Sequence, residues 1–280
     1  MRDILSLYHE ELDPLYGPGE VAAFGEMLFE AFLGWDKVRL LTSREQTIDQ
    51  SDLLRFHWAL EDLKRHRPIQ HIIGYTDFCG SRIKVSPDVL IPRPETEEIV
   101  NWIFHTIHYP LSTIHYLDLC TDSGCIAIAL KKAFPAADVT AVDISPAALE
   151  IARKNAGNNG VDVRFVEGDV LGGVDGLSGS YGLIVSNPPY VMEKERAQMQ
   201  RNVLDYDPAL ALFVPDDDPL RFYNAIATIA KEHLADGGLL VVEINEALAA
   251  ETCAVFKAQG LNPNVHEDFR GKPRWISAQA

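Results

Sequence analysis

The sequence predicts a doubly wound α/β domain preceded by a small helical bundle, and three observations predict it. Beyond residue 95, short apolar runs alternate with longer amphipathic ones, which is typical of parallel strands joined by helices. The first seventy or so residues contain helical patterns only. A Pro-rich stretch with short β-type runs separates the two regions. We therefore expect a helical domain at 1–72, a β-hairpin linker at 73–94 and a domain with a mostly parallel, seven-stranded sheet at 95–280.

The first part of the chain has apolar residues at helical spacing over 1–12, 20–33 and 52–65. Pro18 suits the start of the second helix, because the N–H that proline lacks would have no partner there. Each stretch has one apolar stripe and must bury it against the others, so we expect a small bundle. The expected stripes are Val21, Phe24, Leu28 and Phe32 in the second stretch and Leu53, Phe56, Leu60 and Leu63 in the third.

The pattern then changes from helical to alternating. Residues 69–94 hold short β-type runs, such as 81–85, and a Pro-rich turn at 91–94. We expect parallel strands at 114–119, 138–142, 163–167, 182–186 and 239–244, and helices at 95–108, 124–134, 146–158, 220–235 and 248–259. Two further β-type pieces, 264–269 and 274–277, complete the sheet as an antiparallel edge hairpin.

The net charge of −16, from 41 acidic and 25 basic residues, argues against nucleic acid as a direct partner. Proteins that bind nucleic acid gain much of their affinity from basic surfaces that displace counterions from phosphates. The N-terminus is too acidic for a signal peptide, and no apolar run approaches the ~20 residues that span a bilayer. We expect a cytoplasmic monomer with no membrane partner.

The four cysteines, Cys79, Cys120, Cys125 and Cys253, include no C-x-x-C pair. Cys120 and Cys125 are close in sequence, but no histidine or further cysteine completes a set of metal ligands. We interpret them as small buried residues and expect no metal in the site.

Polar residues follow four consecutive predicted strands, at the edge where doubly wound sheets bind ligands. The loop 118–124 has small residues and leads into a helix whose N-terminus offers free N–H groups to a carboxylate. Asp143 lies at the spacing of an acid that binds ribose hydroxyls, and Asp169 is placed to accept from an adenine amino group. Asn187 follows the fourth strand. Each residue alone is typical of a cap or turn, but together they predict an adenosyl ligand.

Asn187, Pro188, Pro189 and Tyr190 form the most informative stretch of the chain. Two consecutive prolines have fixed φ angles and no N–H, so the segment is stiff. An Asn carboxamide beside such carbonyls offers fixed acceptors for a planar NH₂ group. Holding both N–H bonds turns the nitrogen lone pair toward an incoming methyl group, so the stretch favours methylation of an amide or amino nitrogen over a simple Pro-Pro turn.

These motifs resemble those of class I S-adenosylmethionine-dependent methyltransferases, and most closely the HemK/PrmC family of release-factor glutamine methyltransferases. The most specific pieces are residues 68–74, 85–97, 118–130 and 185–190. The resemblance runs along the chain and implies a Rossmann-like sheet, with the N-terminal bundle helping to hold a protein substrate.

The resemblance also implies the reaction, which is methylation of the side-chain amide nitrogen of the glutamine in the Gly-Gly-Gln motif of class 1 peptide-chain release factors. Asn187, Pro188 and Tyr190 are the implied catalytic residues: Asn187 and the Pro188 carbonyl accept the two N–H bonds, and Tyr190 packs on the amide. The implied glutamine-binding residues are Asn187, Pro188, Pro189 and Tyr190. The expected S-adenosylmethionine-binding residues are Asp118, Cys120, Thr121, Asp122, Ser123, Gly124, Asp143, Asp169, Val170 and Asn187.

Three residues depart from the family pattern. Cys120 and Asp122 stand where relatives usually have glycine, and Val170 where some have an aromatic residue. Asp122 weakens binding if it faces the carboxylate of the donor, by up to ~4 kcal/mol at an effective dielectric near 20, and strengthens binding if it faces the ammonium.

Three alternative functions remain at this point. Asn-Pro-Pro-Tyr also serves methylation of adenine in nucleic acid, Asp122 is compatible with a catalytically impaired binding protein, and glutamine methylation of another protein shares every motif.

Overall fold

The computed structural model describes residues 2–42, 46–107, 114–177 and 179–279, and the chain divides into two compact units. The first unit extends to Tyr75 and includes Gln200–Tyr206, and the second comprises Thr76–Met199 and the chain from Asp207 onward. The helix ends predicted at Met1 and His108 lie outside the described residues. No described helix has both the length and the apolar character needed to cross a membrane.

The first unit is helical, as the apolar stripes predict. It contains α1 (Arg2–Tyr16), α2 (Pro18–Leu33), α3 (Lys37–Thr42), α4 (Gln50–Lys64), α5 (Ile69–Ile73) and α9 (Arg201–Leu204). Phe24, Leu28 and Phe56 are buried in its core, and the Tyr8 hydroxyl donates to the Phe56 carbonyl at 2.6 Å. Leu53 is 43% exposed, because it lies in the first turn of α4 and the buried stripe begins only at Phe56.

Residues 69–73 form the short helix α5, so the β-type runs within 69–94 begin only after it. Gly74 ends α5 with a left-handed φ of 86°, and its N–H donates to the Gln70 carbonyl. The hairpin follows, with β1 (Tyr75–Phe78) and β2 (Ser81–Lys84) in a two-stranded sheet. Cys79 and Gly80 between them both have positive φ, as tight hairpin turns require.

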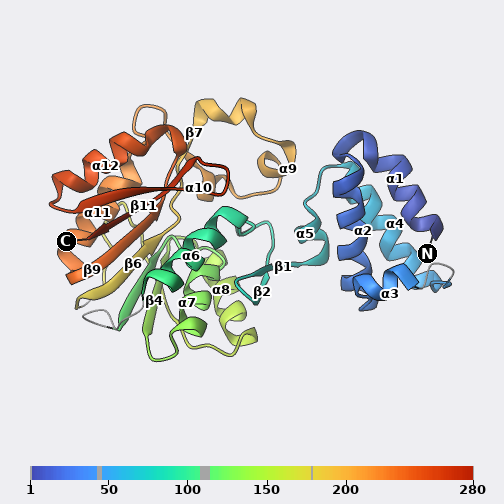
Figure 1. Ribbon diagram of the computed structural model, residues 1–280, viewed down its shortest axis with the longest axis horizontal. Helices are drawn as coiled ribbons and strands as arrows, with labels where there is room; N and C mark the ends of the chain where they lie inside the picture. The colour runs from blue at the N-terminus through green and yellow to red at the C-terminus, as the bar shows by residue number, and fades with distance from the viewer. Residues whose placement is uncertain (1, 43–45, 108–113, 178, 280) are drawn as a thin grey trace. The chain divides into compact units, whose positions relative to one another are not determined.

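The second unit is built on the predicted seven-stranded sheet, in the order β10-β11-β9-β6-β3-β4-β5 (Figure 1). The five parallel strands are β3 (His115–Leu119), β4 (Asp138–Asp143), β5 (Arg164–Glu167), β6 (Tyr181–Ser186) and β9 (Leu234–Glu243). The antiparallel strands are β10 (Asn262–Glu267) and β11 (Pro273–Gln279), with β11 lying between β9 and β10. The predicted fold class is therefore confirmed.

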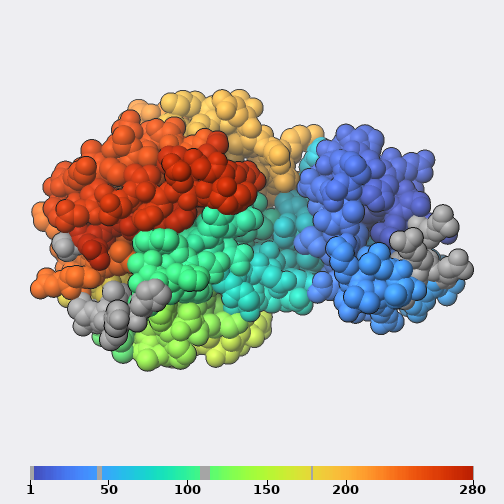
Figure 2. All heavy atoms as spheres, in the orientation of Figure 1, coloured from blue at the N-terminus to red at the C-terminus, as the bar shows by residue number. Residues whose placement is uncertain are grey.

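Helices cover both faces of this sheet because its inner strands are apolar on both sides. Leu239 and Val241 pack in the core with α6 (Pro94–Thr106), α7 (Cys125–Ala133) and α8 (Pro146–Asn158). Leu240 and Val242, which point the opposite way along β9, pack with α11 (Arg221–His233) and α12 (Ala249–Ala258). In Figure 2 the central segment, in green, and the C-terminal segment, in orange and red, form one continuous surface.

The segment between β6 and α11 contains short elements that the sequence did not predict. They are β7 (Val191–Met192), a 3₁₀ helix (Glu193–Gln198), α10 (Ala209–Leu212) and β8 (Phe213–Val214), with β7 and β8 paired in parallel; another short 3₁₀ helix, Glu246–Leu248, precedes α12. Elements of two to six residues are too short to show a hydrophobic period.

Chain order reverses between β3 and β6. The chain moves outward from β3 through β4 to β5 and then returns to β6 on the other side of β3. Ligands bind beyond the carboxyl ends of parallel strands at such a switch point. A ligand site is therefore expected beyond the residues that end the four strands, Leu119, Asp143, Glu167 and Ser186.

Candidate functional site

In the loop between β3 and α7, every second residue from Cys120 to Gly124 has a left-handed backbone conformation. Cys120, Asp122 and Gly124 have φ angles of 58°, 52° and 79°. A left-handed conformation costs a residue with a side chain roughly 1–2 kcal/mol. This backbone explains why glycine is usual at positions 120 and 122 in the family that the sequence resembles. The Thr121 N–H fastens the loop to β4 by donating to the Val142 carbonyl at 2.9 Å.

Asp118, near the end of β3, stabilises this loop through hydrogen bonds. It is fully buried, and its Oδ2 accepts from the Thr121 hydroxyl at 2.5 Å and from the Ala127 N–H at 3.2 Å. Burial raises the pKa of Asp118 to about 7, although both hydrogen bonds oppose the rise. Asp118 thus couples the loop to the start of α7.

The raised pKa of Asp118 predicts a pH-dependent stability. The unfolded chain releases this proton near about pH 3.9, so between about pH 4 and 7 the folded protein holds a proton that the unfolded chain has lost. The stabilising contribution is therefore present at acid pH and is lost as the pH rises through about 7. We expect the free energy of unfolding of the wild type, relative to Asp118→Asn, to fall as the pH rises from about 4 to about 7 in urea titrations. A difference that stays constant over this range would contradict the assignment.

A cavity lies over the carboxyl ends of the strands. Among the predicted site residues, those that line it are Cys120, Thr121, Asp122, Ser123, Asp143, Asp169, Val170, Asn187 and Pro189. Asp118, Gly124, Pro188 and Tyr190 are not among the lining residues. Apolar walls come from residues to which the sequence assigned no role, including Leu90, Pro92, Ile144, Leu171, Leu210 and Phe222. The structure thus brings the ends of β3, β4, β5 and β6 together around one space.

The cavity is acidic. Four aspartates line it, Asp88, Asp122, Asp143 and Asp169, and the described lining residues include no Lys, Arg or His. Burial and the nearby Asp143 raise the pKa of Asp122 well above its usual value, although N–H groups of Ser123 and Leu90 face its carboxylate and oppose the rise. A cationic ligand would relieve this repulsion, because it favours the charged form of each carboxylate.

Asp143 ends β4 and holds the turn that follows. Its Oδ1 accepts from the Ser145 N–H at 2.9 Å and its Oδ2 from the Asp122 N–H at 2.8 Å. Ser145, not Asp143, is the N-cap of α8. Burial raises the pKa of Asp143. Since carboxylate oxygens have two lone pairs each, both still have capacity for ligand hydroxyl groups.

The end of β5 offers one polar and one apolar group. Asp169 is exposed, and its Oδ1 accepts from the Leu171 N–H at 2.9 Å, whereas Val170 is buried. An exposed carboxylate beside an apolar wall is compatible with a flat, partly polar ring such as adenine.

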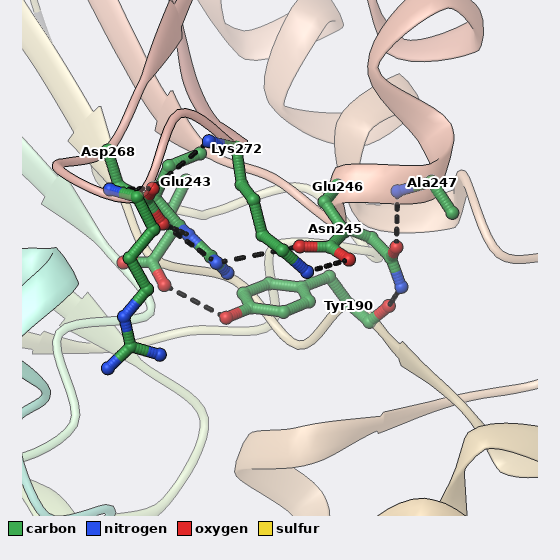
Figure 3. A network of polar contacts seen from close by, with 9 residues as sticks. Tyr190, Glu243, Asn245, Glu246, Ala247, Asp268 and Lys272 are labelled. Carbon is green, nitrogen blue, oxygen red and sulfur yellow. Dashed lines mark hydrogen bonds and ion pairs between the residues drawn. The ribbon is translucent and has the colours of Figure 1, made fainter.

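Asn187 follows β6 directly and lines the cavity, and hydrogen bonds fix its side-chain amide. Its Nδ2 donates to the Thr96 hydroxyl at 3.2 Å, and that hydroxyl donates to Glu243 Oε2 at 2.7 Å. The Tyr190 hydroxyl donates to Glu243 Oε1 at 2.9 Å, as Figure 3 shows. Tyr190 therefore points its hydroxyl at Glu243, and its packing against a substrate amide stays a prediction.

Sequence reasoning gave no role to Thr96 or Glu243. Thr96 lines the cavity from the first turn of α6, and Glu243 is buried at the end of β9. A charged residue directly after the apolar run Leu239–Val242 is the signal that could have identified Glu243, because glutamate is rarely fully buried without partners.

Arg93 and Asp207 form an ion pair beside the cavity. The Asp207 side chain is fully buried, and burial raises its pKa to about 6 while Arg93 lowers it. The next residue, Pro208, lines the cavity, so the ion pair anchors this part of the wall. Glu97, in the first turn of α6, accepts from the Cys79 N–H at 2.7 Å.

Comparison with known proteins gives three kinds of relative. Residues 17–74 match the family described as PrmC N-terminal domain, and residues 103–206 match the methyltransferase small domain. The release factor glutamine methyltransferase of Bacteroides thetaiotaomicron is 41% identical, with 99% of both chains covered. That of Flavobacterium psychrophilum is 40% identical over 95% of this chain and 94% of its own.

Among solved structures, a methyltransferase from Pyrococcus furiosus aligns with 82% of this chain and 98% of its own at a TM-score of 0.52. At 19% identity this likeness concerns the fold alone. Fold and family together imply a methyl donor of the S-adenosylmethionine type, which suits an acidic cavity over strand ends. On these grounds the chain belongs to the family of release factor glutamine methyltransferases.

Proposed function

We propose that the protein transfers a methyl group from S-adenosylmethionine to the side-chain amide nitrogen of the glutamine in the Gly-Gly-Gln motif of class 1 peptide-chain release factors. The names of the relatives support the substrate. The observation that carries the proposal is Asn187 in the wall of an acidic cavity, with its Nδ2 bound to Thr96 and its Oδ1 left for an N–H of a ligand. Release factors act in translation, which places the reaction in the cytoplasm.

The cavity suits this donor in charge and in the residues that line it. When bound, S-adenosylmethionine supplies an electrophilic methyl group on a positively charged sulfonium. The proposed contacts are Asp143 with the ribose hydroxyls, Asp169 with the adenine amino group, and Val170 with the adenine ring. Asp122, with the loop 120–124, would face the methionine part.

The chain's own contribution to the reaction is positioning. Asn187 Oδ1 and the Pro188 carbonyl accept the two N–H bonds of the glutamine amide and so direct its nitrogen lone pair. Holding reacting atoms roughly 3–3.5 Å apart supplies several kcal/mol of rate acceleration.

Asp122→Asn tests the charge argument. We expect it to weaken binding of S-adenosylmethionine by about tenfold, or ~1.4 kcal/mol, and to weaken binding of the uncharged-sulfur product S-adenosylhomocysteine less. Titration calorimetry measures both affinities. Asp122→Gly also removes the left-handed strain, so tighter donor binding in both variants would mean that Asp122 impairs the site.

Incubation of the protein with labelled S-adenosylmethionine and a purified class 1 release factor tests the proposed function. We expect one methyl group on the motif glutamine, mapped by peptide mass spectrometry, and none on a release factor whose glutamine is replaced by alanine. Label on adenine of an oligonucleotide, or on another protein only, would identify one of the alternative functions instead.

A further inference from the structure

A chain of hydrogen bonds ends on one buried carboxylate. It runs from Asn187 Nδ2 through the Thr96 hydroxyl to Glu243 Oε2, over 3.2 and 2.7 Å. Thr96 and Glu243 are 2% and 1% exposed, so water does not replace these partners. The three residues come from the end of β6, the start of α6 and the end of β9.

Glu243 determines which group donates in each of these hydrogen bonds. A carboxylate has no proton to donate, so Thr96 must give its single hydroxyl proton to Glu243. The Thr96 oxygen is then an acceptor, and only the NH₂ side of the Asn187 amide can face it. The Asn187 Oδ1 is thereby turned away from Thr96 and toward the ligand.

The neighbours of Glu243 support its role as an acceptor on both oxygens. The Tyr190 hydroxyl donates to Oε1, and burial together with Glu243 raises the pKa of Tyr190 well above its usual value, so it keeps that proton. Burial raises the pKa of Glu243, and the hydrogen bonds from Thr96 and Tyr190 together with the nearby Arg274 oppose this rise by favouring the carboxylate. Arg274 is itself held by Asp268 Oδ2, at 3.1 Å from both Nε and Nη2. Figure 3 shows Asp268 and Glu243 on the same side of Tyr190.

We propose that Glu243 is a positioning residue that makes the site selective for a carboxamide over a carboxylate, by fixing which way the Asn187 amide faces. With Oδ1 toward the ligand, Asn187 accepts from the NH₂ of glutamine and repels the carboxylate of glutamate. This inference rests on the proposed function for the identity of the acceptor.

Glu243→Gln is the primary test because glutamine has the shape of glutamate. It removes only the requirement that the Thr96 hydroxyl donate to residue 243. The carboxamide that it introduces can accept from Tyr190 and donate to Thr96, whose hydroxyl then donates to Asn187 Oδ1 and reverses the amide. We expect kcat to fall roughly 10²-fold, the size found for loss of one preorganised group, while the affinity for S-adenosylmethionine changes less than about twofold. We also expect binding of a release factor with glutamate in place of the motif glutamine to strengthen relative to the natural one. Unchanged kcat and an unchanged glutamine-to-glutamate preference would overturn the proposal.

A pair of variants at Thr96 provides a second test. Thr96→Val keeps the side-chain volume but removes the hydroxyl that connects Asn187 to Glu243. We therefore expect a loss of kcat similar to that of Glu243→Gln. Thr96→Ser keeps the hydroxyl and should retain most of the turnover. Equal activity of the Val and Ser variants would mean that the hydroxyl carries no orienting role.

A third test needs no release factor. It follows the hydrogen exchange of the Asn187 side-chain NH₂ by NMR in the ligand-free protein. We expect slow exchange in the wild type and fast exchange in Glu243→Gln and Thr96→Val. If this holds but the wild type does not methylate release factors, the proposed function fails and the orientation of Asn187 stands. Equal exchange in all three proteins would overturn the orientation itself.

Discussion

Replacing Asn187 with alanine is expected to reduce turnover by about 10³-fold or more while leaving the affinity for the methyl donor within about threefold. The amide reaches the cavity from the end of β6, where Pro188 and Pro189 fix the backbone behind it. Alanine removes the acceptor that orients the substrate nitrogen but leaves the aspartates of the cavity in place. The loss should therefore appear in kcat and not in donor binding.

Initial rates with a release factor and calorimetry with S-adenosylmethionine measure the two quantities separately. Asn224→Ala is a matched control, because Asn224 is an exposed asparagine on α11. Near-normal turnover in Asn187→Ala would refute the role of Asn187.

Gly124→Ala is expected to have a large effect on stability. Gly124 has a φ of 79°, and a Cβ there would lie 3.0 Å from the Ala152 Cβ and 3.3 Å from the Ala152 Cα. The left-handed conformation costs roughly 1–2 kcal/mol and the overpacking about 1–3 kcal/mol. We therefore expect a decrease of about 2–5 kcal/mol in the free energy of unfolding, together with weaker donor binding because the loop 120–124 must shift.

Gly160→Ala separates the two contributions. Gly160 has a φ of 66° but no atom within 4 Å of an added Cβ among the described residues, so only the conformational cost remains. Urea unfolding of both variants measures the difference. Equal destabilisation of the two would show that α7 and α8 tolerate the extra methyl group.

Most of the second unit could be predicted from the sequence because its strands and helices are long enough to show their periods. The stretch from Leu239 to Val242 is apolar at every position and lies in the middle of the sheet. α5 was not predicted as a separate helix because its five residues are too few to show a period, and its end is set by Gly74. β7, α10 and β8 were not predicted because two to four residues carry no period.

The sequence predicted those residues of the candidate site that lie at the end of a parallel strand or just after it. Asp143, Asp169 and Asn187 were placed by position alone, and the structure puts all three at one cavity. Thr96 and Glu243 lie 91 and 147 residues from their partners Asn187 and Thr96, so no local spacing connects them. That Tyr190 donates to a buried acid is also invisible in the motif, because the acid belongs to β9.

A crystal structure of the protein with S-adenosylhomocysteine and a class 1 release factor tests the central claim most directly. The account predicts that the two hydrogens of the motif glutamine's amide point at Asn187 Oδ1 and the Pro188 carbonyl, with N···O distances of about 2.7–3.2 Å. A glutamine side chain bound elsewhere, or an Asn187 that presents its NH₂ to the glutamine, would contradict it.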